Sequence, residues 1–374
     1  MLIGVTKEIK VDEYRVGLTP AAVRELVSHG HEVLVQSMTG DVIGLHDEDY
    51  QRAGAILVDS AEEVFQRAAM IVKVKEPQPQ EVEQLREGQV LFTYLHLAAA
   101  PDLTHELAAT GCTGIAYETV TDKFGGLPLL APMSEVAGRM SVQAGAHCLE
   151  IEQGGRGMLL GGVPGTPPAK VTIVGGGNVG ANAARVALGM EADVTIIDIS
   201  LHTLAQLDTH FGGGLNTVFS TVDSIHEYVL QADLVVGAVL VPGGATPRLI
   251  SEAMVRDMKR GAVLVDVAID QGGCAATSRP TTHSNPTFKR HDVVHYCVAN
   301  MPGAVARTSA VALNNATLPF VLQLANKGAE TAMADNPHLR RGLNVYGGHV
   351  TYESVALATG DVYLPAEQAL GIPS

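Results

Sequence analysis

"KVTIVGGGNVGANAARVALGM", residues 170–190, joins an apolar run to a glycine-rich turn and a helical segment. Gly175, Gly177 and Gly180 form the pattern G-x-G-x-x-G, and the next apolar run ends at Asp198. In such a turn the first glycine permits a tight bend and the second lets a pyrophosphate approach the backbone. The third allows the helix to pack closely on the strand. The stretch therefore predicts a dinucleotide-binding βαβ unit, which decides the fold.

The same unit favours NAD over NADP. The helix is expected to begin around Asn178 and Val179, where its free N–H groups suit the phosphates of a dinucleotide. Asp198 is expected to accept hydrogen bonds from the adenosine ribose hydroxyls and to repel a 2′-phosphate. The "ISLHT" that follows supplies no arginine to receive such a phosphate. The alternative is an ordinary βα turn followed by a solvent-facing aspartate.

The composition limits the class of protein. With 374 residues, 46% hydrophobic and 17% charged, the chain can bury a large core, and two domains are expected. Its 25 Lys and Arg against 40 Asp and Glu give a formal net charge of −15, which argues against nucleic-acid binding. We expect no signal peptide, because the strand-like start "MLIGV" lacks a basic region followed by an apolar run. We expect no membrane partner, because the apolar stretches are too short to cross a bilayer. Four scattered cysteines without a C-x-x-C pattern indicate reduced thiols and a cytoplasmic protein.

Short β-branched runs alternate with helical segments, which is typical of α/β proteins. We expect two Rossmann-like lobes with parallel sheets, joined by long helices. Residues 1–131 plus 306–374 would form a substrate-binding domain, and 132–305 an NAD-binding domain. One long helix is expected over 132–150 and another beyond residue 303, interrupted near Pro319, before an irregular, polar C-terminal segment. Strands of the first domain are expected near 2–6, 33–36, 55–58, 70–74, 90–95 and 113–117.

Three basic side chains of the first domain are candidate ligands. Arg15 in "EYRVGLTP", residues 13–20, precedes the helix start Thr19-Pro20, and is either a surface charge or a ligand for an anion. Lys75 in "IVKVKEP", like Lys73, ends a strand, where a lysine protects an edge, lies on the surface or binds a ligand. His96 follows the strand in "VLFTYLHLAAAP", either as a core residue or as a proton carrier where α/β sheets bind ligands.

Further polar candidates follow strands of the second domain. In "GAVLVDVAIDQGG", Asp266 lies within the apolar run and could be structural, whereas Asp270 emerges at the turn and is the better catalytic candidate. Asn300 in "CVANMPG" either binds a carboxamide or is a turn residue. With the three basic residues above, this set suits a small carboxylate whose α-carbon exchanges hydride. The sequence has no HExxH motif, and no metal site is expected.

These motifs run in order along nearly the whole chain and resemble the family of NAD-dependent L-alanine dehydrogenases. Nicotinamide nucleotide transhydrogenase and the saccharopine dehydrogenases share the Arg-Val-x-Leu-Thr-Pro loop and the nucleotide fold more distantly. The resemblance implies reversible oxidative deamination of L-alanine to pyruvate and ammonium, by an enzyme that is usually a homohexamer. The stretches that carry it are "EYRVGLTP", "IVKVKEP", "LFTYLHLA", "GGLPLLAPMSEVAGRM", "GGRGMLLGGVPG", "VGGGNVG", "VDVAIDQGGC" and "HYCVANMPGAVARTSA".

The resemblance also implies a role for each matching residue. Arg15 would hold the substrate carboxylate, and Lys75 would contact the substrate's carboxylate and carbonyl region. His96 would act as acid and base, while Asp270 would assist proton transfer and shape the nicotinamide pocket. Besides the glycine-rich turn and Asp270, the residues expected to line the cofactor are Ser134, Asp198, Ser220, Val239, Leu240, Ile269, Arg279, Val298, Asn300 and Met301.

Two positions depart from the family pattern. Relatives often place a basic residue beside the adenosine where this chain has Thr203. Some relatives carry a metal site near 320–327, where Gln323 and Lys327 are poor magnesium ligands, so we expect none. Two alternative functions stay open: a dehydrogenase of another amino acid, such as a saccharopine-type enzyme, and a non-catalytic NAD-binding module of the transhydrogenase kind. The joint presence of Lys75, His96 and Asp270 argues against the module.

Overall fold

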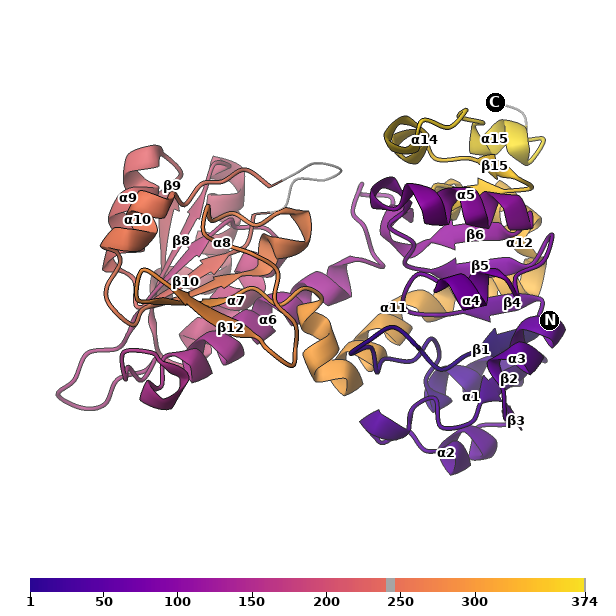
Figure 1. Ribbon diagram of the computed structural model, residues 1–374, viewed down its shortest axis with the longest axis horizontal. Helices are drawn as coiled ribbons and strands as arrows, with labels where there is room; N and C mark the ends of the chain where they lie inside the picture. Colours follow the sequence, from indigo (N-terminus) through magenta and orange to yellow (C-terminus); the bar gives the residue numbers. More distant parts are fainter. Residues whose placement is uncertain (240–245, 373–374) are drawn as a thin grey trace. The chain divides into compact units, whose positions relative to one another are not determined.

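The structure of the protein, a computed structural model, describes residues 1–239 and 246–372. It divides into two compact units, one formed by Met1–Met133 with Val305–Ser374 and the other by Ser134–Ala304. In each unit, helices flank a sheet that is mostly parallel (Figure 1). The α/β class predicted from the sequence is therefore confirmed.

The first unit is built on a sheet of eight strands within its described residues, in the order β15-β14-β6-β5-β4-β1-β2-β3. Strands β1 to β6 run parallel, whereas β14 is antiparallel to β6, and β15 to β14. The sheet is mostly parallel, as predicted, and departs from that arrangement at this edge. The strands are β1 (Leu2–Val5), β2 (Glu32–Gln36), β3 (Ile56–Val58), β4 (Met70–Val72), β5 (Val90–Thr93), β6 (Thr113–Ala116), β14 (Leu343–Tyr346) and β15 (His349–Val350).

The C-terminal segment, expected to be irregular, is folded. Gly347 and Gly348 join β14 to β15 with φ values of 54° and 88°. A two-residue hairpin turn of type I′ requires positive φ at both positions, which glycine adopts without a steric cost. The strands add to the β6 edge, and short helices complete the segment: α12 (Ala329–Asp335), α13 (Pro337–Arg340), α14 (Glu353–Thr359) and α15 (Ala366–Ala369).

The interruption expected near Pro319 is absent, because α11 (Ala306–Lys327) is one continuous helix. Proline removes one backbone hydrogen bond from a helix interior. The buried face of α11, which includes Leu313, Val321 and Leu324, continues on both sides of the proline. Packing of this face therefore outweighs the lost hydrogen bond.

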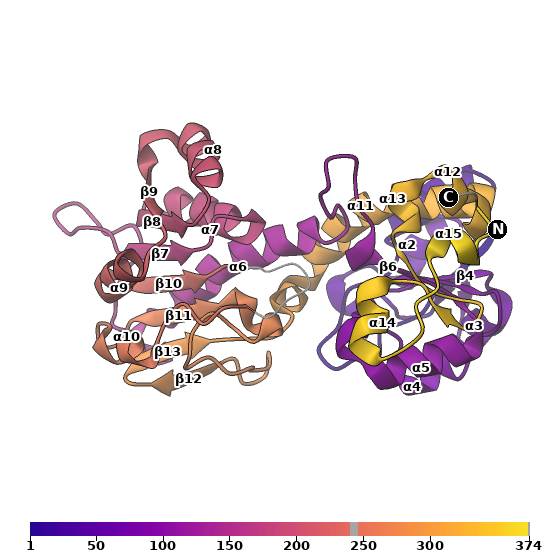
Figure 2. The same ribbon diagram turned by 90° about the horizontal axis from the view of Figure 1, so that it is seen from above.

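The remaining helices of the first unit lie on both faces of its sheet. Figure 2 shows α3 to α5 on one face and α11 to α13 on the other. Helix α1 begins as predicted: Pro20 is its first residue, and the Thr19 hydroxyl accepts a hydrogen bond from the Ala22 N–H at 3.4 Å. The bounds are α1 (Pro20–Ser28), α2 (Asp47–Arg52), α3 (Ala61–Arg67), α4 (Pro79–Val82) and α5 (Pro101–Thr110).

The second unit has seven strands within its described residues, in the order β12-β13-β11-β10-β7-β8-β9. All neighbours are parallel except β12, which is antiparallel to β13 and again departs from the prediction. The strands are β7 (Lys170–Val174), β8 (Asp193–Asp198), β9 (Leu215–Phe219), β10 (Leu234–Gly237), β11 (Val263–Asp266), β12 (Thr287–Arg290) and β13 (Val293–Tyr296). The helices are α6 (Ala131–Cys148), which begins in the first unit, α7 (Asn178–Gly189), α8 (Leu201–Phe211), α9 (Val222–Gln231) and α10 (Glu252–Asp257).

Alternating strand residues of the second unit pack into two separate cores. Leu234 and Val236 belong to one hydrophobic cluster, while Val235 between them belongs to the other. Successive side chains of a strand point to opposite faces, so the sheet is covered on both sides. This explains the nearly unbroken apolar runs in the sequence. Among the described helices, none has the length and apolar character that crossing a bilayer requires.

Candidate functional site

The candidates of the first unit lie at one edge of its sheet. Arg15 is in the loop after β1, Lys75 follows β4, His96 follows β5 and Glu118 follows β6. These four strands are adjacent and parallel. Their carboxyl ends therefore meet at the edge where open α/β sheets bind ligands.

Arg15 is a buried residue, 2% exposed, and not a surface charge. Its Nε and Nη2 donate to the two carboxylate oxygens of Glu13 at 2.6 and 2.5 Å, and Nη1 donates to Met133 Sδ at 3.0 Å. Burial by itself would lower the pKa of Arg15, but the hydrogen bond and charge of Glu13 raise it above its ordinary value. Glu13, for which the sequence alone predicted no role, thus holds the guanidinium in one orientation.

The two lysines after β4 have different environments. Lys73 is fully buried, and its Nζ donates to Glu81 at 2.7 Å and to Glu8 at 3.1 Å. Because β4 lies between β1 and β5, neither lysine can protect an edge of the sheet, and that interpretation is wrong for both. Lys75 is half-buried. Its pKa is lowered mainly by burial and secondly by the nearby positive charge of Arg15. Lys75, which is near Arg15 and only partly covered, is the better candidate ligand.

His96 has an unusual backbone that Glu118 holds in place. Its φ of 52° lies in the left-handed region, and its side chain is 48% exposed. The Glu118 carboxylate accepts hydrogen bonds from the His96 N–H at 2.6 Å and from the Leu95 N–H at 3.3 Å. The imidazole stacks on Tyr94, with ring centroids 5.7 Å apart and planes 5° apart. Strained backbone of this kind is concentrated at functional sites, so His96 is not an ordinary core histidine.

The glycine-rich turn of the second unit has the geometry that its motif predicts. Gly175 has a φ of 106°, and a Cβ on Gly180 would lie 1.9 Å from the Gly175 carbonyl oxygen. A Cβ on Gly177, in contrast, would meet nothing within 4 Å. Helix α7 begins at Asn178 with no side-chain cap among the described residues, so its first N–H groups can bind an anion. The turn therefore fits the pyrophosphate of a dinucleotide.

The glycines provide a matched test of this turn. We expect Gly180→Ala to destabilise the second unit and abolish nucleotide binding, because the added methyl collides with backbone. Gly177→Ala is expected to keep the parental melting temperature within about 2 °C, since its methyl meets only open space. It should nevertheless weaken nucleotide affinity about tenfold or more, because the methyl occupies the approach to the phosphates. Nucleotide titration and thermal melting check both, and a Gly177→Ala variant with parental affinity would contradict the assignment.

Asp198 ends β8 beside this turn. Its carboxylate accepts hydrogen bonds from the Gly176 N–H at 2.6 Å and from the Ser200 N–H at 2.7 Å. A Cβ on Gly176 would lie 3.0 Å from the Thr203 side chain, which places Thr203 next to the turn as well. The simple alternative of a solvent-facing aspartate is therefore incomplete, because Asp198 also orders the turn.

Asp266 is the last residue of β11, whereas Asp270 follows the strand. Asp266 is fully buried, and its Oδ2 accepts hydrogen bonds from the Cys274 and Ala275 N–H groups and from the Ser278 hydroxyl. This is a structural role. Asp270 lies in a short 3-10 helix, Val267–Gln271, and is exposed.

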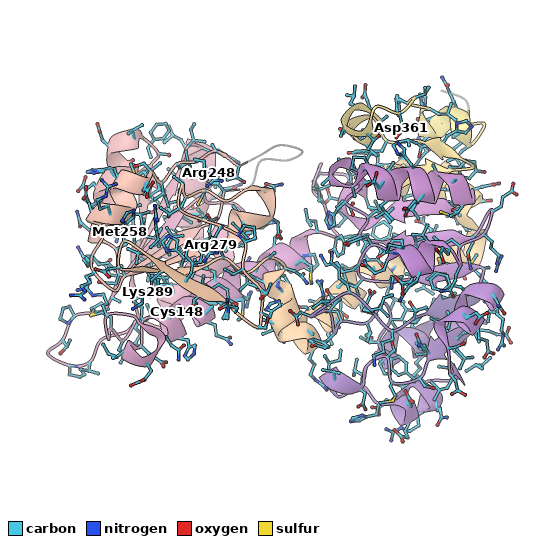
Figure 3. The ribbon with its side chains drawn as sticks, in the orientation of Figure 1. Cys148, Arg248, Met258, Arg279, Lys289 and Asp361 are labelled. Carbon is cyan, nitrogen blue, oxygen red and sulfur yellow. The ribbon has the colours of Figure 1, made fainter. Side chains whose placement is uncertain are left out.

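The other predicted cofactor residues lie mainly at the carboxyl edge of the same sheet. Asn300 has a φ of 61°, and its carbonyl accepts a hydrogen bond from His283, so it is at least a turn residue. Arg279, labelled in Figure 3, is exposed and lies 4.4 Å over the Phe288 ring. Leu240 lies outside the described residues. Ser220 follows β9, Val239 follows β10, Ile269 follows β11, Val298 and Met301 follow β13, and Ser134 lies in the first turns of α6.

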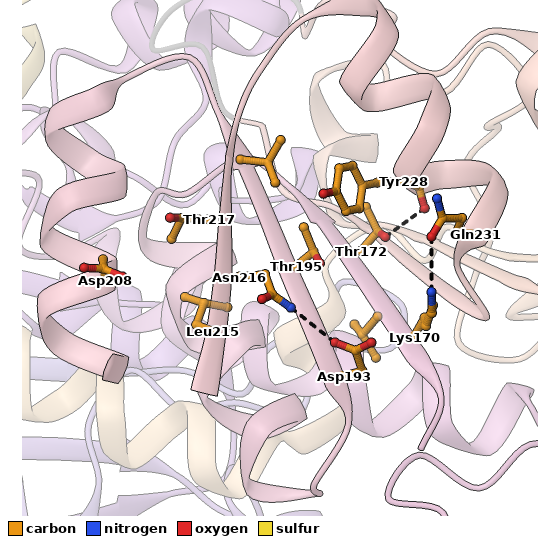
Figure 4. Close-up of a pocket in the computed structure, with 12 residues that line it drawn as sticks. Lys170, Thr172, Asp193, Thr195, Asp208, Leu215, Asn216, Thr217, Tyr228 and Gln231 are labelled. Carbon is orange, nitrogen blue, oxygen red and sulfur yellow. Dashed lines mark hydrogen bonds between the residues drawn. The ribbon is translucent and has the colours of Figure 1, made fainter. Parts of the chain in front are cut away.

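A polar crevice elsewhere in this unit is a weaker candidate. It has a volume of about 480 Å³ and lies over β7, β8 and β9 (Figure 4). Its lining includes Lys170 and Asp193, the first residues of β7 and β8, so it lies toward the amino ends of the strands. Lys170 is hydrogen-bonded to Gln231, and Asp193 to Asn216. The crevice is thus at the wrong end of the strands to be the dinucleotide site.

Comparison with known proteins decides the family. Two protein-family models match the chain. The model described as "Alanine dehydrogenase/PNT, N-terminal domain" matches residues 4–137, and the one described as "Alanine dehydrogenase/PNT, C-terminal domain" matches residues 141–353. The chain belongs to the alanine dehydrogenase/PNT family. Within this family, the alanine dehydrogenase of Halomonas elongata is 58% identical over 99% of this chain and 100% of its own length. That of Bacillus subtilis is 55% identical over 99% of this chain and 98% of its own.

Solved structures of the alanine dehydrogenase/PNT kind have the same fold. An L-alanine dehydrogenase superposes with a TM-score of 0.94 at 50% identity, covering 96% of this chain and 99% of that one. The transhydrogenase from Sinorhizobium meliloti superposes with a TM-score of 0.84 at 21% identity, covering 94% and 100%, which supports the fold alone. The family and its Rossmann-like unit imply a nicotinamide cofactor, and the open glycine turn fits one.

Proposed function

We propose that this chain is an L-alanine dehydrogenase, which converts L-alanine to pyruvate and ammonium with NAD and also runs in reverse. The observation that carries the proposal is its match to curated alanine dehydrogenases at 53–58% identity over 99% of the chain. The polar edge of the first unit and the dinucleotide turn of the second supply the two kinds of site that this reaction needs. We assign them to substrate binding and to NAD binding, respectively.

Arg15 and Lys75 are proposed to bind the substrate carboxylate. A guanidinium forms charge-assisted hydrogen bonds with a carboxylate, and a half-buried lysine adds a second positive charge. Because Glu13 fixes the Arg15 side chain before substrate arrives, little side-chain entropy is lost on binding. The carboxylate is thereby anchored and the α-carbon is oriented for reaction.

His96 is proposed to move the protons of the reaction. When bound, NAD supplies the acceptor for the hydride that leaves the α-carbon. His96 takes a proton from the substrate amine as the iminium forms, and then assists the addition of water to it. With Asp270, His96 moves the protons that let the carbinolamine release ammonium and leave pyruvate. Lys75 stabilises the negative charge that develops on the oxygen.

The cofactor is proposed to be NAD, held by the glycine-rich turn and by Asp198. The Asp198 carboxylate would bind the ribose hydroxyls and disfavour a 2′-phosphate. We expect Asp198→Ala to weaken NAD binding about tenfold or more and to reduce the preference for NAD over NADP. Fluorescence titration with NADH and NADPH measures both. An Asp198→Ala variant with parental affinity for both nucleotides would count against this role.

One assay tests the proposal as a whole. Reduction of NAD is measured with L-alanine as substrate. Glycine and L-serine in place of L-alanine, and NADP in place of NAD, serve as controls. L-alanine with NAD is expected to give the highest kcat/KM. Nucleotide binding without turnover of L-alanine would instead favour the transhydrogenase-like module. Turnover of a different amino acid alone would favour a saccharopine-type or other amino-acid dehydrogenase.

Two further proposals concern the location and the assembly of the protein. We propose a cytoplasmic enzyme, because the four cysteines are buried, unpaired thiols. We also propose a homohexamer, which rests on the family resemblance. Size-exclusion chromatography with light scattering measures the assembly directly.

A further inference from the structure

We propose that Glu13 makes the substrate pocket selective for acids with a single carboxylate, because its charge neutralises one of the two cations there. The inference rests on the proposed function, since it takes Arg15 and Lys75 as the ligands of the substrate carboxylate. It goes beyond that function by naming what excludes acidic amino acids and their 2-oxo acids.

The negative charge of Glu13 is a fixed part of the pocket. Its side chain is 1% exposed and that of Arg15 is 2% exposed. Three hydrogen bonds join the two residues, because the Arg15 backbone N–H also donates to Glu13 Oε1, at 3.1 Å. Glu13 therefore cannot turn into solvent when a substrate arrives, and its charge acts on every ligand.

Two further lysines of these loops are paired with carboxylates. Lys10, in the loop after β1, is paired with Glu76, in the loop after β4. Lys73 is paired with both Glu8 and Glu81 in the interior. Neither lysine adds an uncompensated positive charge to the pocket.

Arg15 and Lys75 with Glu13 thus amount to two positive charges and one negative charge. Arg15 and Lys75 lie in the loops after the neighbouring strands β1 and β4, and the charge of Arg15 and, more weakly, that of Glu13 act on Lys75. A ligand with one carboxylate brings the summed charge of these three groups to zero. Alanine and pyruvate each supply one carboxylate, which matches the substrate class of the proposed reaction.

A second carboxylate is expected to be rejected on the same grounds. With Arg15 and Lys75 engaged by the first carboxylate, a second one would lie beside the buried charge of Glu13, and a buried charge without a cation to pair with is strongly unfavourable. Glu13 itself would repel it. The selection is therefore made by charge, in addition to any effect of size.

Oxamate and oxalate separate charge from size, because they are nearly the same shape but carry one and two negative charges. Their affinities are measured by isothermal titration calorimetry on the full chain, with and without NADH. We expect the parent protein to bind oxamate at least about tenfold more tightly than oxalate. Equal or tighter binding of oxalate by the parent would overturn the proposal without any variant.

Variants then assign the selectivity to Glu13. Glu13→Gln removes the charge while keeping the size, and is expected to shift the oxamate-to-oxalate affinity ratio at least about tenfold toward oxalate. Glu13→Asp keeps the charge and is expected to retain the preference for oxamate. A folded Glu13→Gln protein, judged by its melting temperature and nucleotide affinity, that keeps the parental ratio would overturn the proposal. Absence of L-alanine turnover in the parent would count against the proposed function instead, and would leave the ratio measurable.

Discussion

Replacing His96 with alanine is expected to lower kcat for L-alanine oxidation about a thousandfold. The imidazole, proposed as the proton carrier, is half exposed at the carboxyl edge of the first unit, where the loops that carry Arg15 and Lys75 also lie. Without it, the amine and the carbinolamine must exchange protons with water. Nucleotide affinity should stay within a few-fold of the parental value, because the glycine-rich turn belongs to the other unit. Steady-state kinetics and NADH titration measure the two quantities.

His105 provides the matched control for this variant. It lies in the same unit, its side chain is 54% exposed against 48% for His96, and it is paired with Asp361 at 3.2 Å (Figure 3 labels Asp361). His105→Ala is expected to leave kcat unchanged, which shows that loss of an exposed imidazole is not harmful by itself. If His96→Ala kept a kcat within a few-fold of the parent, the assignment of His96 as acid and base would be wrong.

The position of His96 depends on Glu118 as much as on its own strand. A non-glycine residue in the left-handed region costs on the order of 1–3 kcal/mol and persists only where its surroundings hold it. The Glu118 carboxylate does so by accepting the N–H groups of Leu95 and His96. The stacked Tyr94 ring is itself fixed, because its hydroxyl donates to the Leu129 carbonyl at 2.5 Å. Contacts from several segments of the first unit thus hold the imidazole at the carboxyl edge of the sheet.

Local features of the fold were predictable from the sequence because their signals are short. The close packing at Gly180 and the start of α1 at Thr19-Pro20 each depend on residues a few positions apart. The Gly347-Gly348 hairpin turn carries the same kind of signal, although its polar surroundings led to a prediction of irregular structure. Pro319 misled in the opposite way, because a local rule for helix breaking was outweighed by tertiary packing.

Contacts between distant segments were not predictable, and they decide the details of the site. Glu118 reaches His96 from 22 positions away, and no spacing in the sequence announces that contact. Asn314 of α11 accepts a hydrogen bond from the Thr19 N–H at 2.7 Å, which fixes the end of the Arg15 loop from 295 positions away. The pattern "KVK" makes Lys73 and Lys75 look equivalent. Only the fold shows that Glu8 and Glu81 neutralise Lys73.

Replacing Arg15 with alanine is expected to raise the KM for L-alanine about a hundredfold or more, because the charge-assisted hydrogen bonds to the carboxylate are lost. The same change removes the guanidinium from its buried ion pair with Glu13, whose side chain is 1% exposed. Removing one member of a buried ion pair costs roughly 3–5 kcal/mol, so the melting temperature should also fall. NAD affinity should change little, and a parallel loss of NAD affinity would indicate a merely structural role.

A double variant separates the binding role of Arg15 from its structural role. In Glu13→Ala with Arg15→Ala, neither charge is left buried, so the melting temperature should recover much of the loss caused by Arg15→Ala alone. The KM for L-alanine should remain about a hundredfold above the parental value, because the guanidinium proposed to bind the carboxylate is still absent. If KM recovered together with stability, Arg15 would act only as the partner of Glu13, and the carboxylate would have to be bound by Lys75 alone.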